Sequence, residues 1–249
     1  AGKFLHFCYL STLTVSRSVF SQRNHSRFVS HNVTQPMNKT TITIMILSSI
    51  LSFFGCNGKK ESNKEKSEME LLIEKSVDEF ENRKIYKKLT SEIIKSIPDD
   101  KLEQSIMDNI DTNFKKGEEY TLDKISKLTK GQQAVFSTWW LEAELNNGGF
   151  NQFYFNSSGQ FSKMAEIGFK KIGAEKFSEL TSRSNKIFSE NKERLEEFDD
   201  GTMESFSESY KDNPLNDLDT EFYKLYESEN IGDLRIKYIR ENMNEFTTK

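Results

Sequence analysis

The stretch that decides the fold runs from Gly131 to Gly159 and reads GQQAVFSTWWLEAELNNGGFNQFYFNSSG. Its first half predicts a helix with a broad apolar face, on which Val135, Trp139 and Ala143 recur at helical spacing. The glycines Gly148 and Gly149 accept positive φ, so they predict the end of this helix. A short aromatic segment follows, and the polar residues 156–159 predict a turn that can cap the next helix.

Apolar residues recur at helical spacing on both sides of this stretch, and no comparable run alternates every second residue. An imperfect stripe over 72–93 predicts one long helix stopped by Pro98, and a second stripe follows Asp99 and ends before Gly117. Three more stripes begin at Phe161, at Leu215 after Pro214 and at Ile231. The sequence therefore predicts a single compact, all-α, multi-helix domain over residues 71–249, about the usual size of one domain.

The chain changes character at its N-terminal end. Residues 1–55 contain five Lys or Arg and no acid, whereas residues 56–249 contain 30 bases and 39 acids, a net charge of 30 − 39 = −9. Residues 37–55 predict a secretory signal. The segment begins with Met37 and Lys39, continues with an apolar run over 41–54 and places a small residue before Cys56. The segment FFGC, 53–56, resembles the lipobox of bacterial lipoproteins and makes Cys56 the expected lipidation site.

Two alternatives stand beside this interpretation. The run could be an ordinary signal peptide or an uncleaved anchor, although about 14 apolar residues are short for a membrane span of roughly 20. Residues 1–36 resemble a transit peptide, but a leader translated from too early a start fits better, because a complete signal restarts at Met37. Residues 56–70 are rich in Lys and Glu and predict a flexible tether after the acylated cysteine.

Composition excludes several kinds of site from the mature chain. All three histidines and Cys8 lie within residues 1–55, which leaves Cys56 as the one mature cysteine. A Ser-His-Asp triad, a Cys-His pair, a Cys/His zinc site and a disulfide framework are therefore excluded. We predict a protein that is not an enzyme, with no cofactor and no metal.

Two carboxylates of the decisive stretch are candidates for acid–base chemistry. Glu142 and Glu144 are two apart on a helix and face different sides, so we expect a structural role, such as bonding backbone N–H groups near the paired glycines. Residues 109–120 copy half of a calcium loop but lack its glycine and its bidentate glutamate. The glycine pair lacks the context of a nucleotide loop. The aromatic residues 139–140 and 150–155 are expected in the core rather than along a ligand cleft.

Over roughly residues 97–246 the chain resembles the bacterial DNA-mimic-protein domain family. The resemblance is carried by the WWLEAE helix, the turn 147–150 and two later segments, 218–223 and 238–239. It implies an all-α fold and, from the family's characterised member, a dimer whose surface carboxylates occupy the DNA-binding face of a regulator. The motif residues, with a structural or a binding role, are Trp139, Glu142, Glu144, Asn147, Gly148, Gly149, Phe150, Gln152, Phe153, Asn156 and Gly159.

Negative charge is concentrated late in the chain. Residues 190–233 contain fifteen acids and four bases, a net charge of 4 − 15 = −11. The candidates for an acidic helical face are Glu193, Glu196, Glu197, Asp199, Asp200, Glu204 and Glu208. Such a face can compete for a basic groove that binds DNA, although charge alone more often only keeps a surface solvated.

The predicted signal and the acidic face together favour one function. We expect a membrane-tethered, non-catalytic module at the bacterial cell envelope that binds a basic protein partner, in one version an immunity-type protein. We expect it to attach to the membrane through its lipid and to bind no nucleic acid directly. A homodimer is also possible. The alternative is a cytoplasmic DNA mimic that blocks a DNA-binding regulator, if the signal is not used; an unrecognised enzyme is third.

Overall fold

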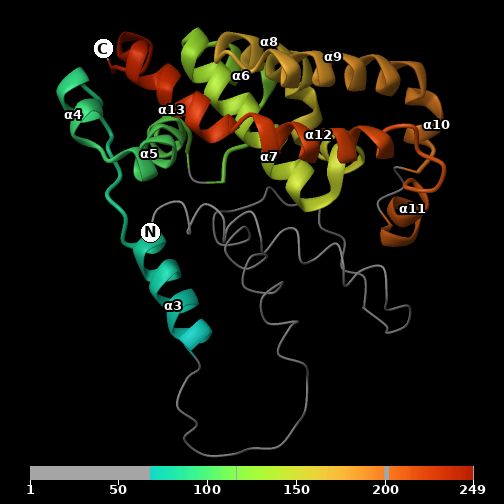
Figure 1. Ribbon diagram of the computed structural model, residues 1–249, viewed down its shortest axis with the longest axis horizontal. Coiled ribbons are helices and arrows are strands. Elements are labelled where there is room, and N and C mark those ends of the chain that lie inside the picture. The colour runs from blue at the N-terminus through green and yellow to red at the C-terminus, as the bar shows by residue number, and fades with distance from the viewer. Residues whose placement is uncertain (1–67, 116, 199–201, 249) are drawn as a thin grey trace, which may run out of the picture.

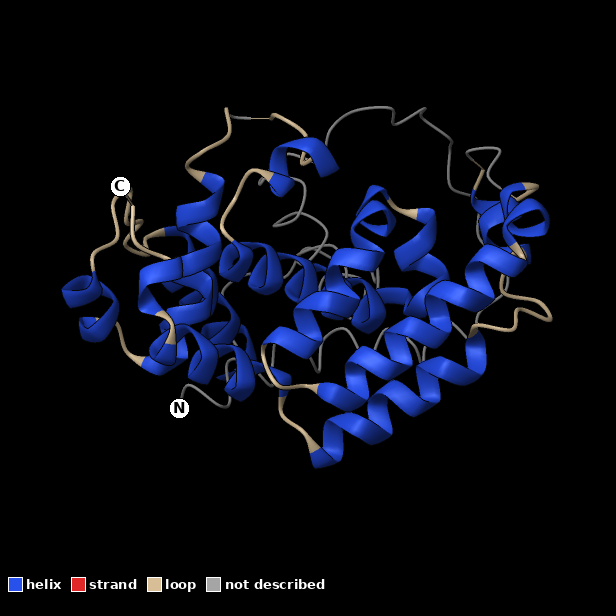
Figure 2. Cartoon of the chain, turned by 90° about the horizontal axis from the view of Figure 1, so that it is seen from above, coloured by secondary structure: helices blue, strands red, loops and turns tan. Residues whose placement is uncertain are grey.

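The computed structural model describes residues 68–115, 117–198 and 202–248. Every regular element in these ranges is a helix, which confirms the all-α prediction (Figure 2). The predicted leader, the signal, Cys56 and the tether up to residue 67 lie outside the described residues, as do Asp199 and Asp200. Residues 68–70, expected in the tether, form the first turn of α3. No helix in the described part is both long and apolar enough to cross a bilayer.

The helices follow one another with short connections. Their bounds are α3 Glu68–Glu81, α4 Ser91–Ser96, α5 Asp99–Asp111, α6 Leu122–Ser126, α7 Lys130–Phe155, α8 Ser162–Lys171, α9 Glu175–Glu190, α10 Lys192–Glu196, α11 Met203–Glu208, α12 Asn216–Ser228 and α13 Ile231–Glu241, with 3₁₀ turns at Ser157–Phe161 and Met243–Glu245. Pro98 and Pro214 stand at helix boundaries, as predicted.

The long helix α7 is the centre of the core. It packs against α5, α8 and α12, and α8 in turn packs against α9 (Figure 1). Gly168 lets α8 approach closely, because a Cβ there would lie 3.0–3.1 Å from Thr138 and Ala134 on α7. Thr129 begins α7 with a capping box completed by Gln132, which satisfies backbone groups at the helix start. The decisive stretch of sequence thus forms the element around which the others assemble.

The prediction of one long helix over 72–93 is wrong. The chain leaves the helix after Glu81 and re-enters one at Ser91, where the Thr90 hydroxyl caps α4. Between them, the Asn109 side chain donates to the carbonyl oxygen of Tyr86 at 2.8 Å, and Leu89 is buried. Tertiary contacts and the cap therefore prevail over the imperfect apolar periodicity.

The predicted end of the central helix at Gly148 and Gly149 is a sharp kink. Gly148 has φ −163° and ψ 18°, and Gly149 has φ 78° and ψ −173°. The helix resumes at once and continues to Phe155, so the aromatic segment that was expected to follow the helix is itself helical. The glycines therefore redirect α7 instead of ending it.

Candidate functional site

The kink in α7 requires glycine at both positions. A Cβ on Gly149 would lie 2.2 Å from the Asp219 carboxylate, and its φ of 78° disfavours any other residue. A Cβ on Gly148 would meet Gln152 at 2.2 Å and the Tyr210 hydroxyl at 2.8 Å. The paired glycines thus provide both a backbone conformation and room for two side chains from the C-terminal part of the chain.

Side chains from a distant segment satisfy the backbone groups that the kink frees. Asp219 of α12 accepts a hydrogen bond from the Phe150 N–H at 2.8 Å. Tyr210 donates to the Gly148 carbonyl at 2.8 Å, and Tyr223 donates to the Leu145 carbonyl at 3.0 Å. The expectation that Glu142 or Glu144 would bond these N–H groups is wrong, because Asp219 takes that role. Asp219 and Tyr223 belong to the later sequence match at 218–223, which these contacts explain.

Glu144 joins the two halves of α7 across the kink. Its carboxylate accepts hydrogen bonds from Gln152 at 2.9 Å, Asn156 at 2.7 Å and Ser158 at 2.9 Å. Burial raises the pKa of Glu144 above its usual 4.5, although these three hydrogen bonds act in the opposite direction. The side chains of Gln152 and Asn156 are therefore engaged in hydrogen bonds within the protein, although Asn156 is exposed, and Asn147 is exposed as well.

Glu142 lies on another side of the helix, in a buried charged cluster. It contacts the guanidinium of Arg235 on α13 and the hydroxyl of Tyr226 on α12. The Arg235 side chain is fully buried, and its Nε donates to Glu103 of α5 at 2.7 Å. Burial opposes the charged form of Arg235, but the two carboxylates outweigh it and raise its pKa. The cluster joins four helices, and the Arg235 charge that neutralises Glu142 argues against an acid–base role for this carboxylate.

The aromatic residues of the motif belong to the core, as expected. Phe150 and Phe153 are completely buried, while Trp139 and Trp140 are half-buried and pack against the core. Tyr154 stacks on Phe188 of α9 with ring centroids 4.1 Å apart. Gly159 is held close to the backbone of Phe153 and Tyr154. The described residues of the motif thus organise the fold and do not line a ligand cleft.

The described candidates for the acidic face are all exposed. Glu193, Glu196 and Glu197 lie on or directly after α10, and Glu204 and Glu208 lie on α11. Figure 1 shows α10 and α11 at the end of the molecule opposite α4 and the C-terminus. Asp217 and Glu227 of α12 are also exposed, although nothing in the local sequence distinguishes them from the other acids of residues 190–233. We use the term acidic surface for the exposed carboxylates on α10, α11 and α12 and directly after α10. They are Glu193, Glu196, Glu197, Glu204, Glu208, Asp217 and Glu227.

Part of this charge is compensated locally. Lys192 lies 3.4 Å from Glu196, and Lys211 lies 2.7 Å from Glu208. Glu193, Glu197 and Glu204 form no ion pair with another described residue. Exposed pairs on a helix contribute little stability, so these carboxylates are available to a partner at small cost.

Buried polar side chains join the segment between α11 and α12 to the kink. Asn151, directly after the kink, donates to the Ser209 hydroxyl at 2.7 Å and accepts from the Asn213 side chain at 2.7 Å. All three residues are buried. Specific hydrogen bonds thus hold the connection between α11 and α12 against α7.

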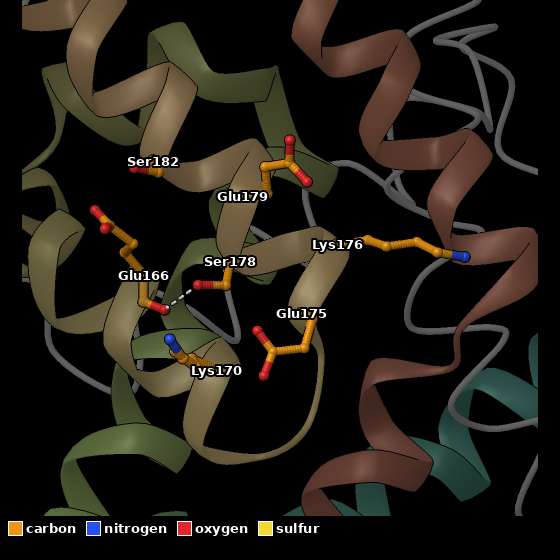
Figure 3. Close-up of a pocket in the computed structure, with 7 residues that line it drawn as sticks. All are labelled: Glu166, Lys170, Glu175, Lys176, Ser178, Glu179 and Ser182. Atoms are coloured by element: carbon orange, nitrogen blue, oxygen red, sulfur yellow. Dashed lines mark hydrogen bonds between the residues drawn. The ribbon is translucent and has the colours of Figure 1, made fainter.

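A surface depression lies between α8 and α9 (Figure 3). It is lined by carboxylates and ammonium groups together, and the Ser178 hydroxyl donates to the Glu166 backbone carbonyl at 2.9 Å. Glu166 is paired with Lys163 at 2.7 Å. Charges of both signs and internal pairing give this depression no clear ligand preference. Within the described ranges, no group of three His, Cys, Asp or Glu side chains is placed to hold a metal ion.

The fold and its surface define a class: an all-α domain with a kinked central helix and an acidic end. Residues 126–242 match the model of the family described as DMP19-like protein. The resemblance predicted from the sequence is confirmed over this segment, which runs from the end of α6 through α13. No curated protein and no solved structure matches the chain. The family match suggests a non-enzymatic, protein-binding role.

Proposed function

We propose that this protein is a non-catalytic module that binds a basic protein partner through the acidic surface. The observation that carries the proposal is the exposure of Glu193, Glu197 and Glu204 together at one end of the domain, inside the segment that matches the family. An acidic surface raises the rate at which the protein encounters a basic partner. Salt screens this attraction, so binding weakens as the salt concentration rises. The buried Glu142 and the half-buried Glu144, by contrast, have structural partners.

The binding proposal is tested by charge-neutral variants at constant shape. We expect Glu193→Gln, Glu197→Gln and Glu204→Gln, combined, to weaken binding about tenfold or more and to reduce its salt dependence. The matched control is Glu119→Gln, Glu175→Gln and Glu241→Gln, three exposed carboxylates outside the acidic surface. Equal binding by both triple variants would remove the acidic surface from the proposal.

We further propose that lipid on Cys56 places the module at the bacterial envelope. The sequence from Met37 to Cys56 supports this location, and two acyl chains give stable attachment where one is marginal. Intact mass of the protein from membrane and soluble fractions of its native host tests it. A chain that begins at acylated Cys56 is expected in the membrane fraction; an unmodified chain in the cytosol would contradict it. One version of the envelope function is an immunity-type protein that blocks an incoming toxin.

The second candidate function is a cytoplasmic DNA mimic. The family match supports it, because it implies a DNA-binding protein as partner. Competition separates the two candidates. DNA should displace the acidic domain from a DNA-binding partner, since both would occupy one basic groove. An envelope partner that DNA does not displace would favour the first candidate.

A further inference from the structure

Three aromatic side chains form a cluster at the acidic end of the domain, where α7 ends and α11 lies (Figure 1). The Phe155 and Phe206 rings meet edge to face with centroids 5.2 Å apart. Phe206 meets Tyr210 in the same way at 5.3 Å. All three side chains are half-buried. We use the term aromatic cluster for Phe155, Phe206 and Tyr210.

The aromatic cluster is separate from the hydrophobic core. Among the described residues, half-buried rings such as Phe114 and Phe188 pack against the buried core, whereas Phe155 and Phe206 do not. Packing of the core therefore does not explain why large aromatic side chains occupy these two positions. A ring that stays partly in water can contribute its remaining apolar area when a binding partner covers it.

Hydrogen bonds hold the aromatic cluster in place on the domain. The Tyr210 hydroxyl donates to the Gly148 carbonyl at 2.8 Å, and Ser209, the preceding residue, accepts from Asn151 at 2.7 Å. Phe155 is the last residue of α7, whose second half is tied across the kink by Glu144. Because these contacts already fix the rings, a partner that covers them loses little additional conformational entropy.

Carboxylates of the acidic surface lie beside the aromatic cluster. Glu204 and Glu208 are each two residues from Phe206 on α11, so they extend from other sides of this short helix. Arg194 of α10 donates to the Asp212 carbonyl at 3.0 Å, which places α10 next to the segment that follows Tyr210. The acidic end thus combines an apolar patch with neighbouring charges, as protein–protein interfaces do.

We propose that the aromatic cluster is the apolar anchor of the partner-binding surface. The basic partner then places an apolar side chain against Phe155 and Phe206 while its positive charges meet the carboxylates. This inference rests on the proposed function, because it names a second part of the same interface. The carboxylates accelerate the encounter, whereas the covered rings slow dissociation.

Two basic peptides of equal charge test the anchor with the full chain. One is a helical lysine–alanine peptide, and in the other leucine replaces alanine on one helical face. Wild type should bind the leucine peptide about tenfold or more tightly than the alanine peptide, because the rings remove the leucine side chains from water. Wild type that shows no preference for the leucine peptide would overturn the proposal.

Substitutions in the aromatic cluster locate the preference. Phe206→Ala should abolish it without changing the salt dependence of binding, whereas Phe206→Leu should keep it, since the position stays apolar. Phe155→Ala is a second variant in case Phe206→Ala does not fold, which urea unfolding shows. The matched control is Phe114→Ala, which removes a half-buried ring 5.0 Å from Tyr120 beyond the end of α5 and should keep the preference. A leucine preference that survives in folded Phe206→Ala or Phe155→Ala would overturn the anchor.

The Gln variant of Glu193, Glu197 and Glu204 separates this proposal from the proposed function. It should weaken the binding of both peptides to a similar degree and keep the preference for leucine. If it binds both peptides as tightly as wild type does, the acidic surface fails as a binding site. The comparison of the two peptides on wild type decides the anchor in either case.

Discussion

At the scale of single residues, Gly149 carries the strictest requirement. We expect Gly149→Ala to lower the free energy of unfolding by about 2 kcal/mol or more, because it combines a positive φ with a clash against Asp219. Urea unfolding measures the loss. Gly117 is the matched control, since its φ is 79° but nothing lies within 4 Å of an added Cβ. Gly117→Ala should cost only about 1 kcal/mol, and equal costs would argue against the contact with Asp219.

Arg235 is the second residue whose loss should be costly. Arg235→Met should destabilise the protein by about 3–5 kcal/mol, because it leaves Glu103 and Glu142 as uncompensated carboxylates in the interior. Removing Glu142 as well, in Arg235→Met with Glu142→Leu, should recover part of that loss. A double-mutant cycle by chemical denaturation measures the coupling. Additive effects of the two changes would contradict the buried pair.

Glu144 makes stability depend on pH with an unusual sign. Its folded pKa is raised above 4.5, so the folded state binds a proton more readily than the unfolded state does. Its contribution to stability therefore increases as pH falls through the folded pKa towards 4.5. A carboxylate with a lowered pKa behaves in the opposite way and loses its contribution as pH falls below 4.5. Unfolding of wild type and Glu144→Gln between neutral pH and pH 4.5 isolates this contribution. If the two proteins show parallel pH profiles, the raised pKa is wrong.

At the scale of elements, the placement of α11 depends on the hydrogen bonds that Asn151 makes with Ser209 and Asn213. We expect Asn151→Ala to cost about 1–3 kcal/mol, because it removes two buried side-chain hydrogen bonds, one to Ser209 and one from Asn213. Hydrogen exchange should rise selectively across residues 203–215. Asn147→Ala, at an exposed position on the same helix, is the control and should leave exchange there unchanged. A uniform rise across the domain would indicate general destabilisation instead.

The local sequence predicts where the helices lie better than it predicts which residues contact one another between helices. The sequence predicts the helix starts after Pro98 and Pro214 and the interruption at Gly148. Proline and glycine can be interpreted locally, because each restricts or frees the backbone at its own position. The burial of Glu142 was foreseeable from its place in an apolar helix. Its partner Arg235 was not, because 93 residues separate them and no local pattern joins them. The split of the predicted helix at 72–93 was missed for the same reason, since Asn109 and Thr248 hold it from elsewhere in the chain.

At the scale of the whole molecule, one set of carboxylates stabilises the fold and a different set is available to bind a partner. Asp219, Glu142 and Glu144 are turned inwards, where they hold the kink and the core. Glu193, Glu197 and Glu204 are turned outwards at the end of the domain. This separation predicts that the outer carboxylates can be neutralised with a change in unfolding free energy of less than about 0.5 kcal/mol. Binding and stability are therefore separable by mutation.

We infer that the outer carboxylates bind a basic protein partner. The most direct measurement is quantitative pull-down from the native host with wild type, the Gln variant of Glu193, Glu197 and Glu204, and the control variant of Glu119, Glu175 and Glu241. We predict one basic protein retained by wild type and control, lost by the first variant and released as salt rises. Retention of the same protein by all three, at every salt concentration, would contradict the claim.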